Sequence, residues 1–503
     1  MRNGKMNRAL LPLLLDGTPP ALEQMLRQEG VPVRGVGESG VPARFVLFDG
    51  RRGPSRPLTA DQTPIEIRGL DGGTLAEALD LFESPRAMES ARHTWDIGGF
   101  RVAEEVATID RRGLRRHVLA VLRDALERVG GRWLNISAYP FPYHSLFTFR
   151  IDYDNYDAED LSNVLRAVEG HEHATTHFIS GAAYDGRHDA LRRFDGLDVA
   201  SHGYWHHTYR TARENHDNIE RGIEVLRRAG LNPSGHASPH GRYNEGLRRA
   251  MERLGITHSS EFSLARDDWP FFPDGGQVLQ IPIHPICLGL FLDAARTAEA
   301  FGGSHSADPT TRFRDNPAAR LRAVAAARRH FLAVAKRNYA AGEPIVLYGH
   351  PCGRLGRHDE LLRDIFATVA EMKAVWRTTF SRLNRWWRAR QGIQLAVHAE
   401  GDHLVIRSQG LPERWKPAVE LWRGRHLARL PLQGPTLRIQ RGALAYENRA
   451  SAEGLHPVRI DSGHGLRGRV ARWLDWEKVT PIDEISTETM RGKAKRLLRR
   501  LKG

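Results

Sequence analysis

The chain has 503 residues, of which 41% are hydrophobic and 27% are charged, which excludes a fibrous or low-complexity protein and allows several buried cores. Its two cysteines, Cys287 and Cys352, exclude a disulfide framework and a cysteine-rich metal site. The formal net charge of +14 suits an anionic partner, but an Arg-rich composition explains this charge equally well, and we expect no nucleic-acid binding.

Residues 1–140 are predicted to form an α/β module of unknown role. The basic start and the apolar run at 9–15 imitate a signal peptide, but Pro12 interrupts the run and Asp16 follows it. We therefore interpret the run as a first strand or helix. The sequence contains no run of about 18 apolar residues, so we expect no membrane helix and a cytoplasmic protein. Apolar patterns further predict a helix at 22–28, strands at 45–48 and 65–67, and a helix at 114–129.

Strands and helices alternate over residues 145–390, which predicts parallel β/α architecture, open or closed into a barrel. The predicted strands lie at 146–151, 174–179, 197–200, 234–238, 278–283 and 344–348. The predicted helices lie at 160–168, 187–194, from a capping box at 211–214 to Gly230, and at 243–254, 317–339, 360–372 and 379–390.

The pattern changes after Gly392, where short alternating segments predict a small antiparallel β domain at 393–480. Its predicted strands lie at 393–397, 403–406, 419–422, 436–439 and 443–446. The tail at 481–503 is basic. This charge would permit peripheral contact with a membrane or an anionic glycan, although a solvated terminal helix is the simpler interpretation.

His202 and His206 lie four residues apart, directly after the predicted strand at 197–200. Two imidazoles at this spacing fall on one side of a helical turn, so both can face one metal ion. The chain has 24 histidines, so the pair alone is weak evidence, and surface or core histidines are the simpler interpretation.

Other polar residues also follow predicted strands: Asp152 and Asp154, Pro239-His240, and His350. In a β/α barrel such positions collect at the C-terminal ends of the strands, where active sites lie. One carboxylate with the histidine pair makes an open ligand set for Zn²⁺ or a similar ion, and the second carboxylate is then a base for water. Two aspartates that cap the next helix are an equally good interpretation of these residue types.

Four motifs follow one another in this part of the chain: Phe149-Arg150-Ile151-Asp152-Tyr153-Asp154, Ser201-His202 to His206, Ser238-Pro239-His240-Gly241, and Leu347-Tyr348-Gly349-His350. In this order they resemble the motifs of the polysaccharide deacetylases, the NodB-homology family also called carbohydrate esterase family 4. The helix at 380–390, with Trp386-Trp387, resembles the end of such domains. The resemblance covers about residues 145–390 and implies a deformed (β/α) barrel that removes N- or O-acetyl groups from sugars.

The resemblance also implies roles for individual residues. Asp154, His202 and His206 would hold a divalent metal, expected to be Zn²⁺. Asp152 would be the general base and His350 the general acid, with the metal and a backbone N–H stabilising the oxyanion. The expected substrate-binding residues are Pro239, His240 and Trp269.

This sequence departs from the family pattern at two positions. Tyr153 separates two aspartates that are usually adjacent, so the roles of Asp152 and Asp154 could be exchanged. Ala237 stands where the family usually has an arginine that holds the base, which leaves Arg150 or His236 as candidates for that role.

Further candidates surround the predicted site. Asp267-Asp268-Trp269 is expected to supply an aromatic wall and a carboxylate that orients His350, although an exposed turn explains it equally well. His207 and His240 are candidate substitutes in the ligand and substrate roles.

Three hypotheses follow. The first is a metal-dependent deacetylase acting on N-acetylated sugars of a cell-envelope polysaccharide or glycan precursor, so that an acetylated glycan is its partner. The second is a metal-independent amide hydrolase of the same superfamily, which the missing motif arginine favours slightly. The third is a non-catalytic glycan-binding protein that uses the β domain and the basic surface. The sequence does not predict the oligomeric state.

Overall fold

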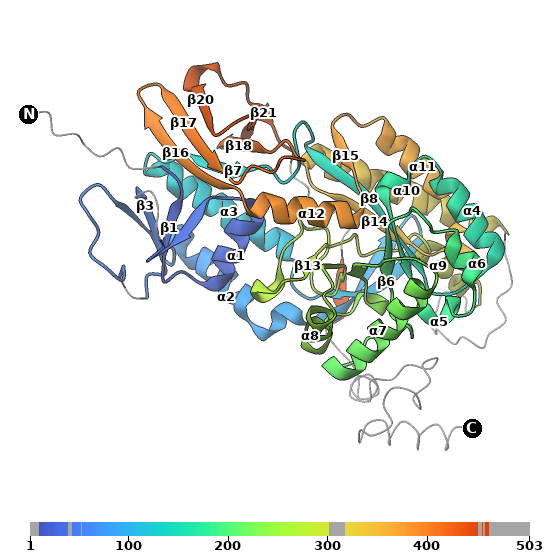
Figure 1. Cartoon of the computed structure of the whole chain (residues 1–503). Coiled ribbons are helices and arrows are strands. Elements are labelled where there is room, and N and C mark those ends of the chain that lie inside the picture. The colour runs from blue at the N-terminus through green and yellow to red at the C-terminus, as the bar shows by residue number, and fades with distance from the viewer. Residues whose placement is uncertain are drawn as a thin grey trace, which may run out of the picture.

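The N-terminal part of the chain is a four-stranded parallel sheet with helices beside it, coloured blue in Figure 1. The computed structural model describes residues 10–38, 43–51, 53–300, 317–450, 455 and 458–461. The sheet order is β2-β1-β3-β4, with β1 at Leu13–Asp16, β2 at Val33–Gly35, β3 at Phe45–Phe48 and β4 at Thr63–Glu66. The helices are α1 at Pro20–Glu29, α2 at Thr74–Glu83 and α3 at Arg111–Arg128. The predicted α/β character of this part is therefore confirmed, and the apolar run near Pro12 is a strand.

The central part contains an eight-stranded sheet in which every pairing is parallel. Its order is β13-β12-β11-β10-β9-β8-β14, and β15 also pairs with β8. The strands are β8 at Ser145–Tyr153, β9 at Thr175–Ile179, β10 at Val199–Ser201, β11 at Gly235–His236, β12 at His258–Ser259, β13 at Leu279–Gln280, β14 at Ile345–Gly349 and β15 at Val375–Arg377. The segment after β13 returns to β14, where the His284 N–H donates to the Val346 carbonyl at 2.8 Å. The sheet therefore curls into the predicted deformed (β/α) barrel.

The helices of the central part lie near their predicted positions, except that α5 and α9 were not predicted. They are α4 at Ala158–Val168, α5 at Gly181–Tyr184, α6 at His188–Arg192, α7 at Ala212–Arg228, α8 at Glu245–Arg253, α9 at Leu290–Ala300, α10 at Pro317–Ala341, α11 at Glu360–Ala370 and α12 at Phe380–Gln391. Thr211 caps α7 as predicted, because its hydroxyl accepts the Glu214 N–H at 3.2 Å.

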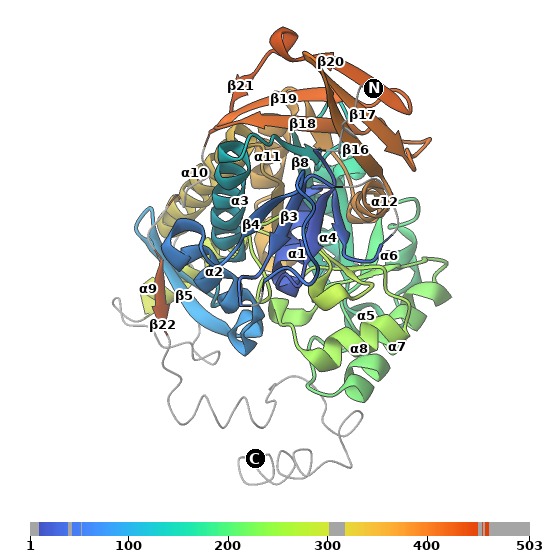
Figure 2. The same cartoon turned by 90° about the vertical axis from the view of Figure 1, so that its left-hand side faces the viewer.

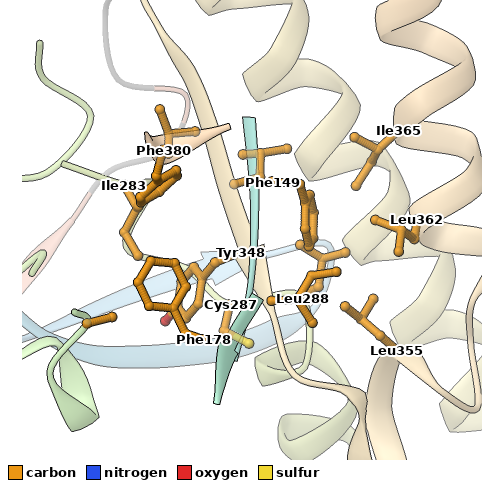
Figure 3. Packing of buried hydrophobic residues seen from close by; sticks show 14 of the residues in the cluster. Phe149, Phe178, Ile283, Cys287, Leu288, Tyr348, Leu355, Leu362, Ile365 and Phe380 are labelled. Carbon is orange, nitrogen blue, oxygen red and sulfur yellow. The ribbon is translucent and has the colours of Figure 1, made fainter. Parts of the chain in front are cut away.

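Strand β8 explains how the core and the polar barrel interior arise from one sequence. Side chains alternate along a strand, so Phe149 and Ile151 enter the hydrophobic cluster while Arg150 and Asp152 face the polar side. Figure 3 shows Phe149 opposite Leu362 of α11, and Cys287 beside Tyr348. The alternation thus places the carboxylates on a rigid, fully buried strand.

The C-terminal part forms antiparallel sheets, as predicted; its strands β16 to β21 are orange to red in Figure 1, and β7, which joins one sheet from the earlier chain, is cyan. One sheet has the order β16-β17-β20 and the other β21-β19-β18-β7. Their strands are β7 at Trp133–Ile136, β16 at Gln394–Glu400, β17 at His403–Gln409, β18 at Ala418–Arg423, β19 at His426–Pro431, β20 at Thr436–Gln440 and β21 at Glu447–Asn448. The strand predicted at 443–446 is wrong: a 3-10 turn at Arg441–Ala443 precedes a segment without strand pairing. The predicted tail at 481–503 lies outside the described residues.

The N-terminal and C-terminal parts share one hydrophobic core. Strand β7 pairs with β18 across nearly 300 residues of sequence, with Val419 opposite Ile136 and Trp422 opposite Trp133. Residues from 10–136 and 393–439 fill the same cluster of buried side chains. This shared core joins the N-terminal part to the C-terminal part. The predicted domain boundaries at residues 140 and 393 remain a proposal.

A separate hairpin packs on the barrel. Strands β5 at Ser90–Ile97 and β6 at Phe100–Ala107 pair antiparallel, and β22 at Arg459–Asp461 adds to β5 (Figure 2). Trp95 and Val102 of this hairpin belong to the barrel's hydrophobic cluster. Among the described helices, none has both the length and the apolar character needed to cross a bilayer.

Replacing Glu420 by Gln should destabilise the protein by about 3 kcal/mol, since it breaks a buried charge pair. Glu420 is 1% exposed, accepts two bonds from Arg429 at 2.6 and 3.1 Å, and also accepts from Asn135 on β7. Burial alone would raise the pKa of Glu420, but Arg429 and Arg449 outweigh it and lower the pKa to about 2. The ionised carboxylate therefore stabilises the fold above about pH 4.5, and this stabilisation is lost as the pH falls towards 2.

Urea unfolding of both proteins from pH 7 to pH 3 measures this difference. The exposed pair of Glu400 with Arg438 gives the matched control, because Glu400→Gln should cost less than about 1 kcal/mol. Equal stability of Glu420→Gln and the unchanged protein at pH 7 would contradict the prediction.

Candidate active site

Asp152 and Asp154 lie at the C-terminal end of β8 and face the same imidazole. His350 Nε2 is 3.9 Å from Asp152 Oδ2 and 3.4 Å from Asp154 Oδ2. Tyr153 points to the opposite side, where its hydroxyl lies 2.9 Å from His177 Nδ1. The inserted tyrosine therefore leaves both carboxylates at one site, because side chains two apart on a strand share a face.

The histidine pair follows β10 in a loop and not in a helical turn, so the helical interpretation of its spacing is wrong. Gly203 has a φ of 76°, which turns the chain directly after His202. This loop still brings the pair together: Asp154 Oδ1 lies 3.2 Å from His202 Nε2 and 3.4 Å from His206 Nε2. One ligand atom from each of the three residues lies within 4.8 Å of the others.

These three residues fit a divalent metal. His202 Nδ1 is 2.7 Å from the Ala237 carbonyl, which assigns the ring hydrogen to Nδ1 and leaves the Nε2 lone pair facing Asp154. Asp154 Oδ1 is buried and has no hydrogen-bond partner in the described part of the chain. A carboxylate oxygen facing an imidazole lone pair is unfavourable unless a cation lies between them, and one carboxylate with two imidazoles suits Zn²⁺.

The Asp154 carboxyl is also held in its charged form. Burial would raise its pKa, but the neighbouring His350 and His206 imidazoles outweigh burial and keep the pKa well below its usual range. An ionised carboxylate is the form that binds a metal.

Asp152 is held by Arg150. Arg150 Nε and Nη2 donate to the two carboxylate oxygens at 2.7 and 2.6 Å, and Nη1 donates to the Ser260 carbonyl at 2.6 Å. Burial alone would lower the pKa of Arg150, but its contacts with Asp152 raise it. The sequence named Arg150 as one candidate to replace the motif arginine at Ala237, and the geometry supports this candidate over His236.

His350 lies between the carboxylates and a buried thiol. Cys287 Sγ is 3.1 Å from His350 Nδ1 and accepts the Gly289 N–H at 3.3 Å. Burial raises the pKa of the Cys287 thiol to about 12, so the thiol keeps its proton. Burial also lowers the pKa of His350 to about 4, although Asp154 opposes this shift. The ring is therefore neutral, and its contact with Cys287 fixes its orientation with Nε2 towards the carboxylates.

No sequence pattern marked Cys287 for this role, because the residue lies 63 positions before His350 and outside every motif. Asp267, which was expected to orient His350, binds His284 Nδ1 at 3.0 Å. Asp268 binds Arg115 at 2.8 Å. In the described residues a thiol therefore contacts His350 Nδ1 in place of a carboxylate.

The expected substrate-binding residues fall in different places. Pro239 is buried in a turn, and the exposed His240 has its ring centroid 4.7 Å from that of His206. Trp269 is 5% exposed and packs under the Arg115 guanidinium, so no contact in the described residues brings it to the carboxylates. His207 is buried against Tyr209. Of the expected substrate-binding residues, His240 is the one beside the histidine pair.

A pocket of about 230 Å³ opens beside His350 and the two carboxylates. Its further lining includes Asn155, Asp293, Cys352 and Arg354. Arg354 donates to Asp293 at 2.6 Å across this pocket. The pocket is therefore polar and charged, with room for a small hydrophilic group next to the carboxylates.

One protein-family model matches part of the central segment of the chain. The family model described as Polysaccharide deacetylase matches residues 147–259, which include both carboxylates and the histidine pair. Residues 147–259 are thus similar to the polysaccharide deacetylase family. The resemblance is thereby confirmed over residues 147–259, which contain the first three of the four sequence motifs. A comparison with curated proteins found no match.

Solved structures similar to this chain include members of the same family. A candidate polysaccharide deacetylase from Mycobacterium smegmatis is 19% identical with a TM-score of 0.40, over 50% of this chain and 94% of that one. The PuuE allantoinase is 17% identical with a TM-score of 0.38, over 50% and 93% of the two chains. A family 4 pseudoenzyme from Bacillus anthracis is 13% identical with a TM-score of 0.31, over 48% and 65%.

Proposed function

We propose that the central domain is a metal-dependent hydrolase that removes acetyl groups from N-acetylated sugars of a polysaccharide or glycan precursor. The observation that carries this proposal is the convergence of Asp154, His202 and His206 beside a second carboxylate that Arg150 holds. The family match at 147–259 supports the same reaction class. The acetylated glycan is the proposed partner.

In this proposal Asp154, His202 and His206 hold the divalent ion, with Zn²⁺ the best fit to one carboxylate and two imidazoles. When bound, such an ion polarises the acetyl carbonyl and acidifies water. The carbonyl of Ala237 fixes the His202 ring, so that Nε2 faces the ion-binding position before any ion arrives.

Asp152 and His350 carry the proton transfers. Asp152 removes a proton from the attacking water, whose oxygen forms the new bond to the acetyl carbon. The proton that Asp152 takes passes to His350 Nε2, which lies 3.9 Å from Asp152 Oδ2. The imidazolium formed in this way gives the proton to the departing sugar nitrogen as the C–N bond breaks. The products are acetate and the free amine.

Metal analysis of the purified protein, paired with acetate release from N-acetylhexosamine oligomers, tests the proposal. We expect one divalent ion per chain and acetate release that chelation abolishes and added Zn²⁺ restores. Release that survives exhaustive chelation would favour a metal-independent amide hydrolase. Glycan binding without any acetate release would favour the non-catalytic glycan-binding protein.

Replacing Cys287 by Ala should lower kcat about 5- to 10-fold with KM unchanged, because one neutral hydrogen bond contributes roughly 1 kcal/mol. We expect the thiol to orient His350 without touching the substrate, so Cys287→Ser should keep most of the activity because its hydroxyl can form the same hydrogen bond to Nδ1. Steady-state kinetics of both variants and of the unchanged protein check this. Equal kcat in Cys287→Ala and Cys287→Ser would contradict the proposed orientation of the ring.

A further inference from the structure

A second cavity, of about 160 Å³, lies between the barrel, the β5 strand and the start of α3, elements that are labelled in Figure 2. Three arginines from distant parts of the chain line it: Arg112, Arg266 and Arg337. None of its lining residues belongs to the candidate active site. It is therefore a separate polar cavity that the proposed deacetylase chemistry does not use.

Within the described residues, two of these arginines form no side-chain hydrogen bond or ion pair. Arg112 is 8% exposed, yet its side chain forms no hydrogen bond or ion pair, and its Nη1 is a buried atom without a partner in the described part of the chain. Arg266 likewise forms no side-chain hydrogen bond or ion pair there, and its Nε is buried and unpartnered. A buried guanidinium without an acceptor is unfavourable, so such groups are normally paired.

The carboxylates that line the cavity are already engaged. Asp267 contacts His284 Nδ1 with both oxygens at 3.0 Å and lies 3.7 Å from Arg337 Nη2. Asp110 caps α3 by accepting the Gly113 N–H at 3.2 Å. The start of α3 adds the positive end of a helix dipole to the same wall.

Arg112 also lies near enough to repel each of the other two guanidiniums. Burial would lower the pKa of Arg112 itself, but Asp267 and Glu343 outweigh burial and raise it. Burial lowers the pKa of Arg266, and the positive charge of Arg112 adds to this shift against the opposing effects of Asp110 and Asp267. Burial likewise lowers the pKa of Arg337, with Arg112 again contributing. His284 and His330, in contact at 3.0 Å between their Nε2 atoms, complete the polar lining. An anion in the cavity would relieve this repulsion.

We propose that this cavity binds a small oxyanion, a phosphate or carboxylate group, between the unpaired guanidiniums of Arg112 and Arg266. Guanidinium forks match the oxygen pairs of phosphate and carboxylate groups, and charge-assisted hydrogen bonds of this kind are strong. The bound anion joins α3 of the N-terminal part to the barrel, since Arg112 lies on α3 and Arg266 follows β12. The site does not depend on the proposed deacetylation.

Calorimetric titration of the full chain with inorganic phosphate, and separately with acetate, tests this at constant ionic strength set with chloride. We expect one saturable site for at least one of these anions, and the tighter of the two identifies the ligand class. Arg112→Gln and Arg266→Gln should each weaken that binding about tenfold or more, because each removes charge-assisted hydrogen bonds. Arg249→Gln is the matched control, since Arg249 pairs with Glu245 on α8, away from the cavity lining.

Two results would overturn the proposal. One is the absence of saturable binding of either anion up to about 50 mM, an affinity too weak for a built site. The other is unchanged affinity in both Arg112→Gln and Arg266→Gln, which would assign the binding to another site such as the candidate metal centre. Thermal unfolding of each variant checks that it is folded. Because the two substitutions lie in different elements, one variant still tests the site if the other does not fold.

Discussion

Replacing His202 by Ala should remove the divalent ion from the purified protein and lower acetate release by about 100-fold or more, because two ligands do not make a stable site. His202 is 1% exposed and fixed by the Ala237 carbonyl, so no other side chain can take its place without rearranging the loop. Of the two imidazole nitrogens that face Asp154 Oδ1, His202 Nε2 is the nearer, at 3.2 Å. Elemental analysis and acetate release on the same preparation measure the effect.

His216→Ala is the matched control, because His216 lies on α7, is partly exposed and pairs with Asp217 and Glu220. It should keep both the metal and the activity. If His202→Ala retained one ion per chain and full acetate release, the assignment of the metal centre would be wrong.

The barrel and the ligand cluster were predictable because both depend on local patterns. Apolar runs of strand length alternate with amphipathic helices, and parallel strands necessarily gather their C-terminal ends on one face. The motifs at Asp152, His202 and His350 therefore had to meet if the barrel prediction was right. The helical interpretation of the histidine pair failed because Gly203, at a φ of 76°, turns the chain where a helix would continue.

The features that were missed depend on contacts between distant residues. Strand β7 has only four residues, and its pairing with β18 is decided by packing of Trp133 and Trp422 and not by its own sequence. The contact of Cys287 with His350 arises from the segment that closes the barrel after β13, which no motif marks. The segment at 443–446 has a strand-like alternation, but strand propensity decides nothing where no neighbouring strand supplies hydrogen bonds.

Replacing Asp152 by Asn should leave the metal in place and lower kcat by about 10²- to 10⁴-fold, the usual contribution of a general base. Asparagine keeps the size of the side chain but cannot take a proton from water. It also leaves the Arg150 guanidinium, which is 1% exposed, without its anion, so the free energy of unfolding should fall by roughly 3 kcal/mol. Activity is therefore measured well below the melting temperature of the variant.

Asp154→Asn is the decisive comparison, because the sequence alone left the roles of the two aspartates open. If Asp154 is the ligand, as its distances of 3.2 and 3.4 Å from the two imidazoles support, this variant loses the metal and Asp152→Asn does not. The reverse pattern would exchange the roles and require Arg150 to hold a metal ligand instead of a base. A guanidinium that donates to both oxygens of Asp152 competes with a cation for the same lone pairs, which is the physical reason to expect the first outcome.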